Sequence, residues 1–169
     1  MIKIDKYIYR YTSDIFVQNF QCTPKGIKTL LELLSQQSRQ PIFWVIDDLP
    51  ESALLSKLLV EYQIKYFINT NKHCRFLLAA IPADYRNICA RMVQEWNVGS
   101  MFLFNLKNSA QWEECCKNIF KLNARYLIKN GMSSMVIVID FDENSCEISV
   151  DRSSYDISKV VGLIKENLN

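Results

Sequence analysis

The chain has 169 residues, a formal net charge of +2 and a hydrophobic fraction of 49%. A chain of this size and composition folds as one globular domain with a sizeable core, which excludes a disordered or fibrous protein. No stretch reaches the roughly 18 consecutive apolar residues that a membrane helix needs, and the small net charge does not by itself indicate a nucleic-acid partner.

The apolar residues fall into short runs with either strand-like or helix-like spacing. Eight runs have the apolar, β-branched and aromatic residues typical of strands: 3–11, 15–20, 42–46, 64–68, 75–81, 98–106, 135–141 and 146–150. Five segments have apolar residues at helical spacing behind a start signal, and they begin near Thr23, Pro50, Asp84, Asn108 and Ser153. This order predicts one α/β domain over residues 1–169, with about five helices packed on a mixed sheet of parallel and antiparallel strands.

The fourth helix is expected to be the longest and to run from Asn108 to the Asn130-Gly131 pair, a common C-terminal signal. Its apolar stripe is expected to face inward: Trp112, Cys115, Cys116, Ile119, Phe120 and Leu127. Four cations recur every four residues on the opposite side: Lys117, Lys121, Arg125 and Lys129. This basic stripe is either a docking site for phosphates or an acidic protein, or a solvated face that complements the helix dipole.

The last hairpin has the opposite charge. Residues 132–169 hold seven acidic and three basic side chains, whereas residues 61–131 hold five acidic and ten basic ones. Five of the acids lie on or beside the hairpin: Asp140, Asp142, Glu143, Glu147 and Asp151. Glu147 and Asp151 have the same parity along the strand, so they are expected to project to one face. The hairpin is interpreted either as a surface that captures a basic protein or as a solvated sheet face.

Two apolar strands end in carboxylates. Asp47 and Asp48 follow the strand at 42–46, and Asp140 and Asp142 lie at the end of the strand at 135–141. If these strands are parallel neighbours, the four carboxylates meet at one sheet edge, where they are suited to bind Mg²⁺ and support phosphoesterase or nuclease chemistry. The alternative is that Asp47 and Asp48 help to start the next helix and that Asp142 belongs to a polar turn.

The cysteines and the single histidine do not form a recognisable site. The six cysteines contain no Cys-x-x-Cys pair, and His73 directly precedes Cys74. Adjacent residues of an extended chain point to opposite faces, so a thiol–imidazole pair is not expected there. We therefore predict reduced cysteines, no catalytic residue and no cofactor.

In its size, its α/β pattern, its aromatic residues, its local charge patches and its lack of catalytic groups, the chain resembles the bacterial immunity proteins that act against contact-dependent and polymorphic toxins. The resemblance implies a non-enzymatic, cytoplasmic protein that binds one toxin domain and blocks it, and it carries over no individual residue. The charged start of the chain, from Met1 to Lys6, also favours the cytoplasm, because a signal peptide needs an apolar run. The alternative function is the metal-dependent enzyme that uses the four strand-end carboxylates.

Overall fold

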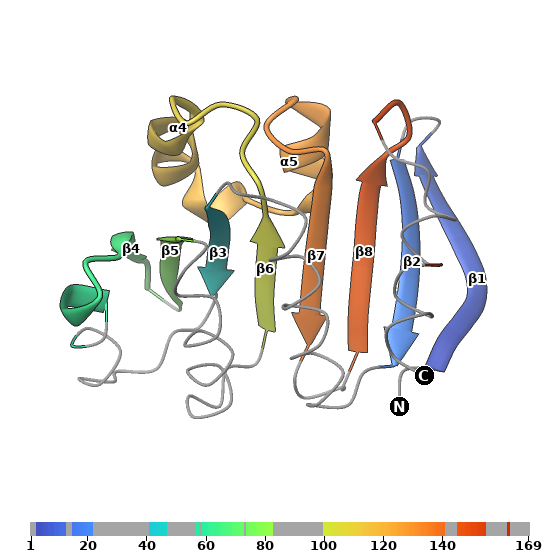
Figure 1. Cartoon of the computed structure of the whole chain (residues 1–169), viewed down its shortest axis with the longest axis horizontal. Helices are drawn as coiled ribbons and strands as arrows, with labels where there is room; N and C mark the ends of the chain where they lie inside the picture. The colour runs from blue at the N-terminus through green and yellow to red at the C-terminus, as the bar shows by residue number, and fades with distance from the viewer. Residues whose placement is uncertain are drawn as a thin grey trace.

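The computed structural model describes residues 3–12, 15–21, 41–46, 57, 59–72, 74–82, 100–140, 145–154 and 162. All eight expected strands are confirmed, with small shifts at their ends. Their bounds are β1 (Lys3–Thr12), β2 (Ile15–Gln21), β3 (Ile42–Ile46), β4 (Lys65–Thr70), β5 (Arg75–Ile81), β6 (Ser100–Phe104), β7 (Met135–Asp140) and β8 (Ser145–Asp151). They form one eight-stranded sheet in the order β1-β2-β8-β7-β6-β3-β5-β4 (Figure 1).

The expectation of a mixed sheet is wrong for these strands, because every neighbouring pair is antiparallel. Parallel strands need long connections, and two long connections here join parallel strands without making them neighbours, whereas the connection from β6 to β7 joins antiparallel neighbours. β3 and β4 run in the same direction, but β5 lies between them. β5 and β6 are also parallel, and β3 lies between them. Among the described strands, those that run in the same direction are therefore never neighbours, and the sheet is antiparallel throughout.

The expectation of one long fourth helix is also wrong, because residues 111–129 form three short helices. These are α4 (Gln111–Lys117), the 3-10 helix η2 (Ile119–Lys121) and α5 (Ala124–Lys129). The side-chain amide of Asn118 donates to the carbonyl of Glu114 over 3.1 Å, at the end of α4. The side chain of Asn123 accepts the backbone N–H of Tyr126 over 2.8 Å and caps α5. Asparagine competes for backbone groups in this way, so it favours helix ends over helix interiors.

Three helices are therefore described, where we expected about five along the chain. The helices expected to begin near Thr23 and Asp84 lie outside the described residues. Residues 59–61 are helical, which agrees with the end of the helix expected from Pro50, and Gly162 is helical within the last expected helix. No helix in the described ranges combines the length and the apolar character that a bilayer-spanning helix requires.

The α4–η2–α5 layer covers one face of the sheet along the edge where β6 ends and β7 begins (Figure 1). One row of side chains runs across this face, from Val136 through Phe104 to Phe43, and all three are buried. They pack with inward residues of the layer: Leu106, Trp112, Cys115, Cys116, Ile119, Leu122, Leu127 and Ile128. The opposite face is also buried along its length, at Leu77, Ile46, Leu103, Ile139 and Ile148. The sheet therefore has a core on both faces.

Candidate functional site

The acidic hairpin lies inside the sheet and not at an edge. β8 is flanked by β2 and β7, and β7 is flanked by β6 and β8. Asp140 and Glu147 are half-buried and project to the same face, since Asp140 is paired with Ser145 and Glu147 with Val138. Asp142 and Glu143 lie outside the described residues. The described acids therefore do not form a protruding patch that a basic partner would meet first.

Asp151 has a structural task at the end of β8. Its Oδ1 accepts the backbone N–H of Ser153 over 3.1 Å and the hydroxyl of Ser153 over 2.9 Å. Its Oδ2 accepts the hydroxyl of Ser154 over 3.0 Å and lies 3.8 Å from Nζ of Lys107. Burial tends to raise the pKa of Asp151, but these hydrogen bonds and the Lys107 charge together lower it. The carboxylate thus holds the turn that follows the strand.

Glu147 lies in the middle of the sheet, on the face that α5 covers only in part. It is aligned with Val138, which is aligned in turn with Phe102, and all three are half-buried. Burial raises the pKa of Glu147, although the Ser149 hydroxyl, which donates to Oε1 over 3.2 Å, opposes the shift. Glu147 and Asp151 do share a face, as their parity predicts, but their surroundings and hydrogen bonds differ.

The strand-end carboxylates expected to hold a metal are not brought together by neighbouring strands. β3 and β7 do run parallel. Ile46 is aligned with Met101, and Met101 is aligned with Ile139, so the C-terminal ends of both strands lie on the same side of the sheet. However, β6 lies between them, which separates the two strands by about 10 Å. Asp47, Asp48 and Asp142 lie outside the described residues, and Asp140 is the one member of this set that can be placed. Among the residues that the structure describes, no group of three or more His, Cys, Asp or Glu side chains could hold a metal.

The described cysteines are free thiols: Cys74, Cys115, Cys116 and Cys146. Burial, together with the neighbouring Cys116 and Glu114, raises the pKa of Cys115 to about 12. A thiol with so high a pKa is a poor nucleophile, because the thiolate is the reactive form. His73, the only imidazole in the chain, lies outside the described residues. The inward positions expected for Cys115 and Cys116 are confirmed, and they are core positions.

The basic stripe does not exist as one helical row, since its four cations lie on three helices: Lys117, Lys121, Arg125 and Lys129. All four are exposed, and none takes part in an ion pair with another described residue. Phe120, which was expected to face inward, is 44% exposed. The break at Asn118 rotates the chain, so η2 buries Ile119 and leaves Phe120 on the surface.

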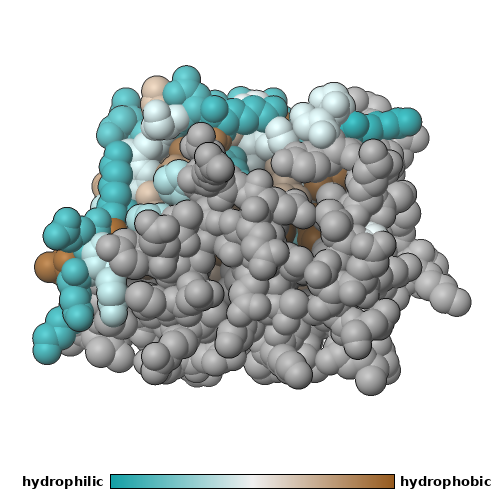
Figure 2. Space-filling view, viewed as in Figure 1, coloured by the Kyte–Doolittle hydropathy of each residue, from teal (hydrophilic) through white to brown (hydrophobic). Residues whose placement is uncertain are grey.

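The exposed apolar side chains lie at one end of the sheet, on both of its faces. The large hydrophobic residues that stand exposed within the described ranges are Val60, Tyr66 and Phe120, at 65%, 39% and 44%. Val60 lies just before β4. Tyr66 of β4 is aligned with Ala79 and projects to one face of the sheet, whereas Phe120 packs against Phe76 of the neighbouring strand β5 on the other face. We call these three residues and the strand β4 the β4 end. Figure 2 shows brown atoms among teal ones at this end of the molecule.

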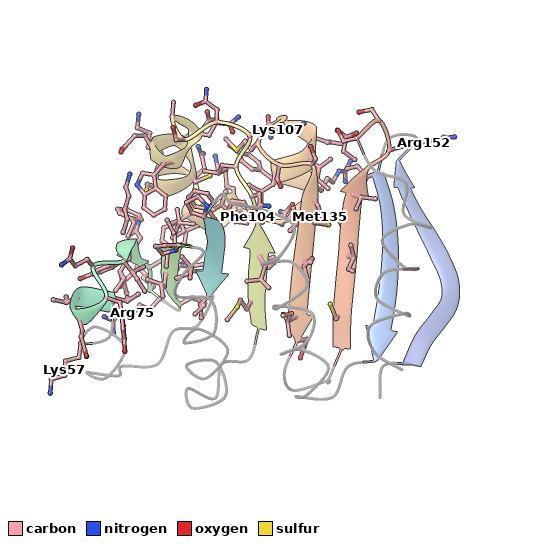
Figure 3. All side chains as sticks on the ribbon, in the orientation of Figure 1. Lys57, Arg75, Phe104, Lys107, Met135 and Arg152 are labelled. Carbon is pink, nitrogen blue, oxygen red and sulfur yellow. The ribbon has the colours of Figure 1, made fainter. Side chains whose placement is uncertain are left out.

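Several cations lie in the same segment of the chain as Val60 and Tyr66. Lys57, Lys65 and Lys72 are exposed, Arg75 is half-buried, and Glu61 is the one acid in residues 57–75. Nζ of Lys65 lies 4.5 Å from the ring centroid of Trp112, which fixes the start of β4 against α4. Figure 3 places Lys57 and Arg75 at the β4 end and Arg152 at the opposite end. The β4 end thus combines exposed apolar side chains on both faces of the sheet with several cations.

The sequence reasoning missed this surface. Val60 gave a usable signal, since it is apolar but lies outside the stripe of the helix expected from Pro50, which is Leu55, Leu58, Leu59 and Tyr62. Phe120 gave none, because its exposure depends on a helix break that its own spacing does not show. Comparison of the chain with protein-family models, with curated proteins and with solved structures finds no match.

Proposed function

We propose that this chain is a non-enzymatic protein-binding module of the immunity-protein type, which neutralises a toxin domain, and that the β4 end makes the contact. The observation that carries the proposal is that Val60, Tyr66 and Phe120, the large apolar side chains exposed in the described ranges, all lie at one end of the sheet. Exposed apolar side chains that cluster and are rimmed by polar ones mark protein interaction sites. Aromatic anchors at the centre of such a patch commonly supply most of the binding free energy.

The charges of the β4 end define the partner's chemistry. Residues 57–75 have exposed Lys57, Lys65 and Lys72 against the single acid Glu61. The exposed Glu113 and Glu114 of α4 are offset by the exposed Lys117 and Lys121. A partner with an acidic surface is therefore steered toward this end and associates faster at low salt. The acidic hairpin, by contrast, favours a basic partner, but its described carboxylates are half-buried or engaged by Ser149, Ser153, Ser154 and Lys107. This difference favours the β4 end as the contact surface.

Co-expression with a toxin domain encoded beside the gene tests the proposal. The wild-type chain is expected to restore growth, and the double variant Val60→Ser, Phe120→Ser is expected to lose this protection while it keeps its fold. Lys129→Glu is the matched control, because it changes an exposed residue of α5 and is expected to protect like the wild type. The proposal is contradicted if the wild-type chain protects against none of the neighbouring domains, or if the double variant protects fully.

A further inference from the structure

The two edges of the sheet differ in how they are built. At one edge, the β1–β2 ladder has two register shifts, between Ile4 and Ile8 and between Arg10 and Thr12. Bulges of this kind twist an edge strand and prevent it from pairing with another chain. At the other edge, β4 pairs with β5 through six consecutive residues without a shift, and it contains neither proline nor glycine. One edge is therefore protected, and the other is a regular template.

The outward backbone groups of β4 follow from the adjoining turn. The N–H of Asn71 donates to the carbonyl of Cys74 over 3.0 Å, so Asn71 and Cys74 form a hydrogen-bonded pair. Hydrogen-bonded pairs alternate along an antiparallel ladder, so the backbone groups of Tyr66, Ile68 and Thr70 point away from β5. In agreement, the N–H of Thr70 donates to its neighbour Asn69 Oδ1 over 2.9 Å. The N–H groups of Tyr66 and Ile68 remain directed outward.

We propose that β4 takes up an extended, acidic segment of the partner as a ninth strand of the sheet. The proposal rests on the proposed function for the existence of a protein partner, and it adds how the partner is held. The outward backbone groups of Tyr66 and Ile68 supply hydrogen bonds, and Tyr66 supplies exposed aromatic surface. The cations at the two ends of β4, Lys65 and Lys72, select an acidic segment. A second copy of this chain would place cations against cations, which disfavours self-pairing.

Two synthetic eight-residue peptides test this pairing without the toxin domain. One alternates Val and Glu, and the other alternates Val and Lys. Amide hydrogen exchange of the full chain is measured with each peptide. Ile68→Pro removes one outward N–H, whereas Ile68→Ala shortens the same side chain and keeps the N–H. Both variants are compared by circular dichroism and thermal unfolding, so that a loss of fold is recognised.

With the Val-Glu peptide, exchange at Tyr66 and Ile68 of the wild-type chain is expected to slow at least tenfold. Ile68→Pro is expected to bind this peptide at least tenfold more weakly than Ile68→Ala, and the Val-Lys peptide is expected to leave exchange unchanged. The proposal is overturned if both peptides bind alike, if no peptide slows exchange in β4, or if sedimentation shows that the chain self-associates through β4. If Ile68→Pro does not fold, the exchange data on the wild type decide. Protection from the toxin without any peptide pairing leaves the proposed function standing and removes the ninth strand.

Discussion

The ring of Phe120 packs edge-on against that of Phe76, with 5.1 Å between their centroids and an angle of 90° between their planes. Aromatic pairs prefer this geometry, because the positive edge of one ring faces the negative surface of the other. Phe76 fixes the position of a ring that is 44% exposed. Phe120 therefore presents a rigid aromatic surface beside the edge strand, and little conformational entropy remains to be lost when a partner covers it.

This relationship predicts a small effect of Phe120 on stability. Phe120→Ala is expected to lower the free energy of unfolding by about 1 kcal/mol, since much of the side chain is already in water. Phe104→Ala is the matched comparison, because Phe104 is 3% exposed and its truncation leaves a cavity that costs about 3–5 kcal/mol. Urea unfolding measures both values. Equal losses for the two variants would show that Phe120 belongs to the core.

Asp151 is predicted to stabilise the turn after β8. Asp151→Ala is expected to lower the free energy of unfolding by about 1 kcal/mol at pH 7, because the hydrogen bonds from Ser153 and Ser154 are lost. The folded pKa of Asp151 lies below its ordinary value near 3.9, so this stabilisation is complete above about pH 4 and disappears as the pH falls through the folded pKa. Urea unfolding of both proteins over the acid range checks this. A constant difference between them down to pH 2 would contradict it.

Glu147 is predicted to have the opposite pH dependence. Burial raises its folded pKa, so the folded chain keeps a proton that the unfolded chain loses near pH 4.3. The contribution of Glu147 to stability therefore falls as the pH rises from about 4.3 through the folded pKa. Glu147→Gln removes this titration and keeps an acceptor for Ser149. It is expected to be more stable than the wild type at pH 7 and equal to it below about pH 4, as measured by thermal unfolding. Greater stability of the wild type at pH 7 would be evidence against this.

Asn123 is predicted to stabilise α5 through its cap. Its side chain accepts the N–H of Tyr126 over 2.8 Å, and loss of such a cap typically costs about 1 kcal/mol. Asn123→Ala is expected to lose this amount, and Asn123→Ser is expected to stay close to the wild type because the hydroxyl accepts the same bond. Chemical denaturation measures both. If alanine and serine are equally destabilising, the cap is not the cause of the helix break.

Local patterns in the sequence were sufficient to place the strands and much of the core. The eight strands have period-two or fully apolar residues, and these patterns depend only on neighbours in the sequence. Inward positions such as Cys115 and Leu127 were also predicted, because each lies on one short helix. These predictions are confirmed because, in these elements, the local spacing of apolar residues matches the side that the fold buries.

Long-range pairing was not predictable in the same way. The antiparallel sheet depends on β5 lying between β3 and β4, which no local pattern encodes. The helix break at Asn118 and Asn123 depends on two side-chain hydrogen bonds that compete with an otherwise helical stripe. The same break exposes Phe120. Because the effect of Asn118 and Asn123 was not predicted, the exposure of Phe120 was not predicted either.

The most direct test compares the β4 end with the acidic hairpin. The chain and its variants are titrated calorimetrically with a toxin domain that the chain neutralises. Phe120→Ser is expected to raise the Kd at least tenfold, which corresponds to about 1.4 kcal/mol. Charge reversal in the hairpin, with Asp142→Lys and Glu143→Lys together, is expected to leave the Kd within about twofold, because rim charges change association rates more than affinity. A Kd that is unchanged by Phe120→Ser but raised by the hairpin variant would contradict the assignment of the β4 end.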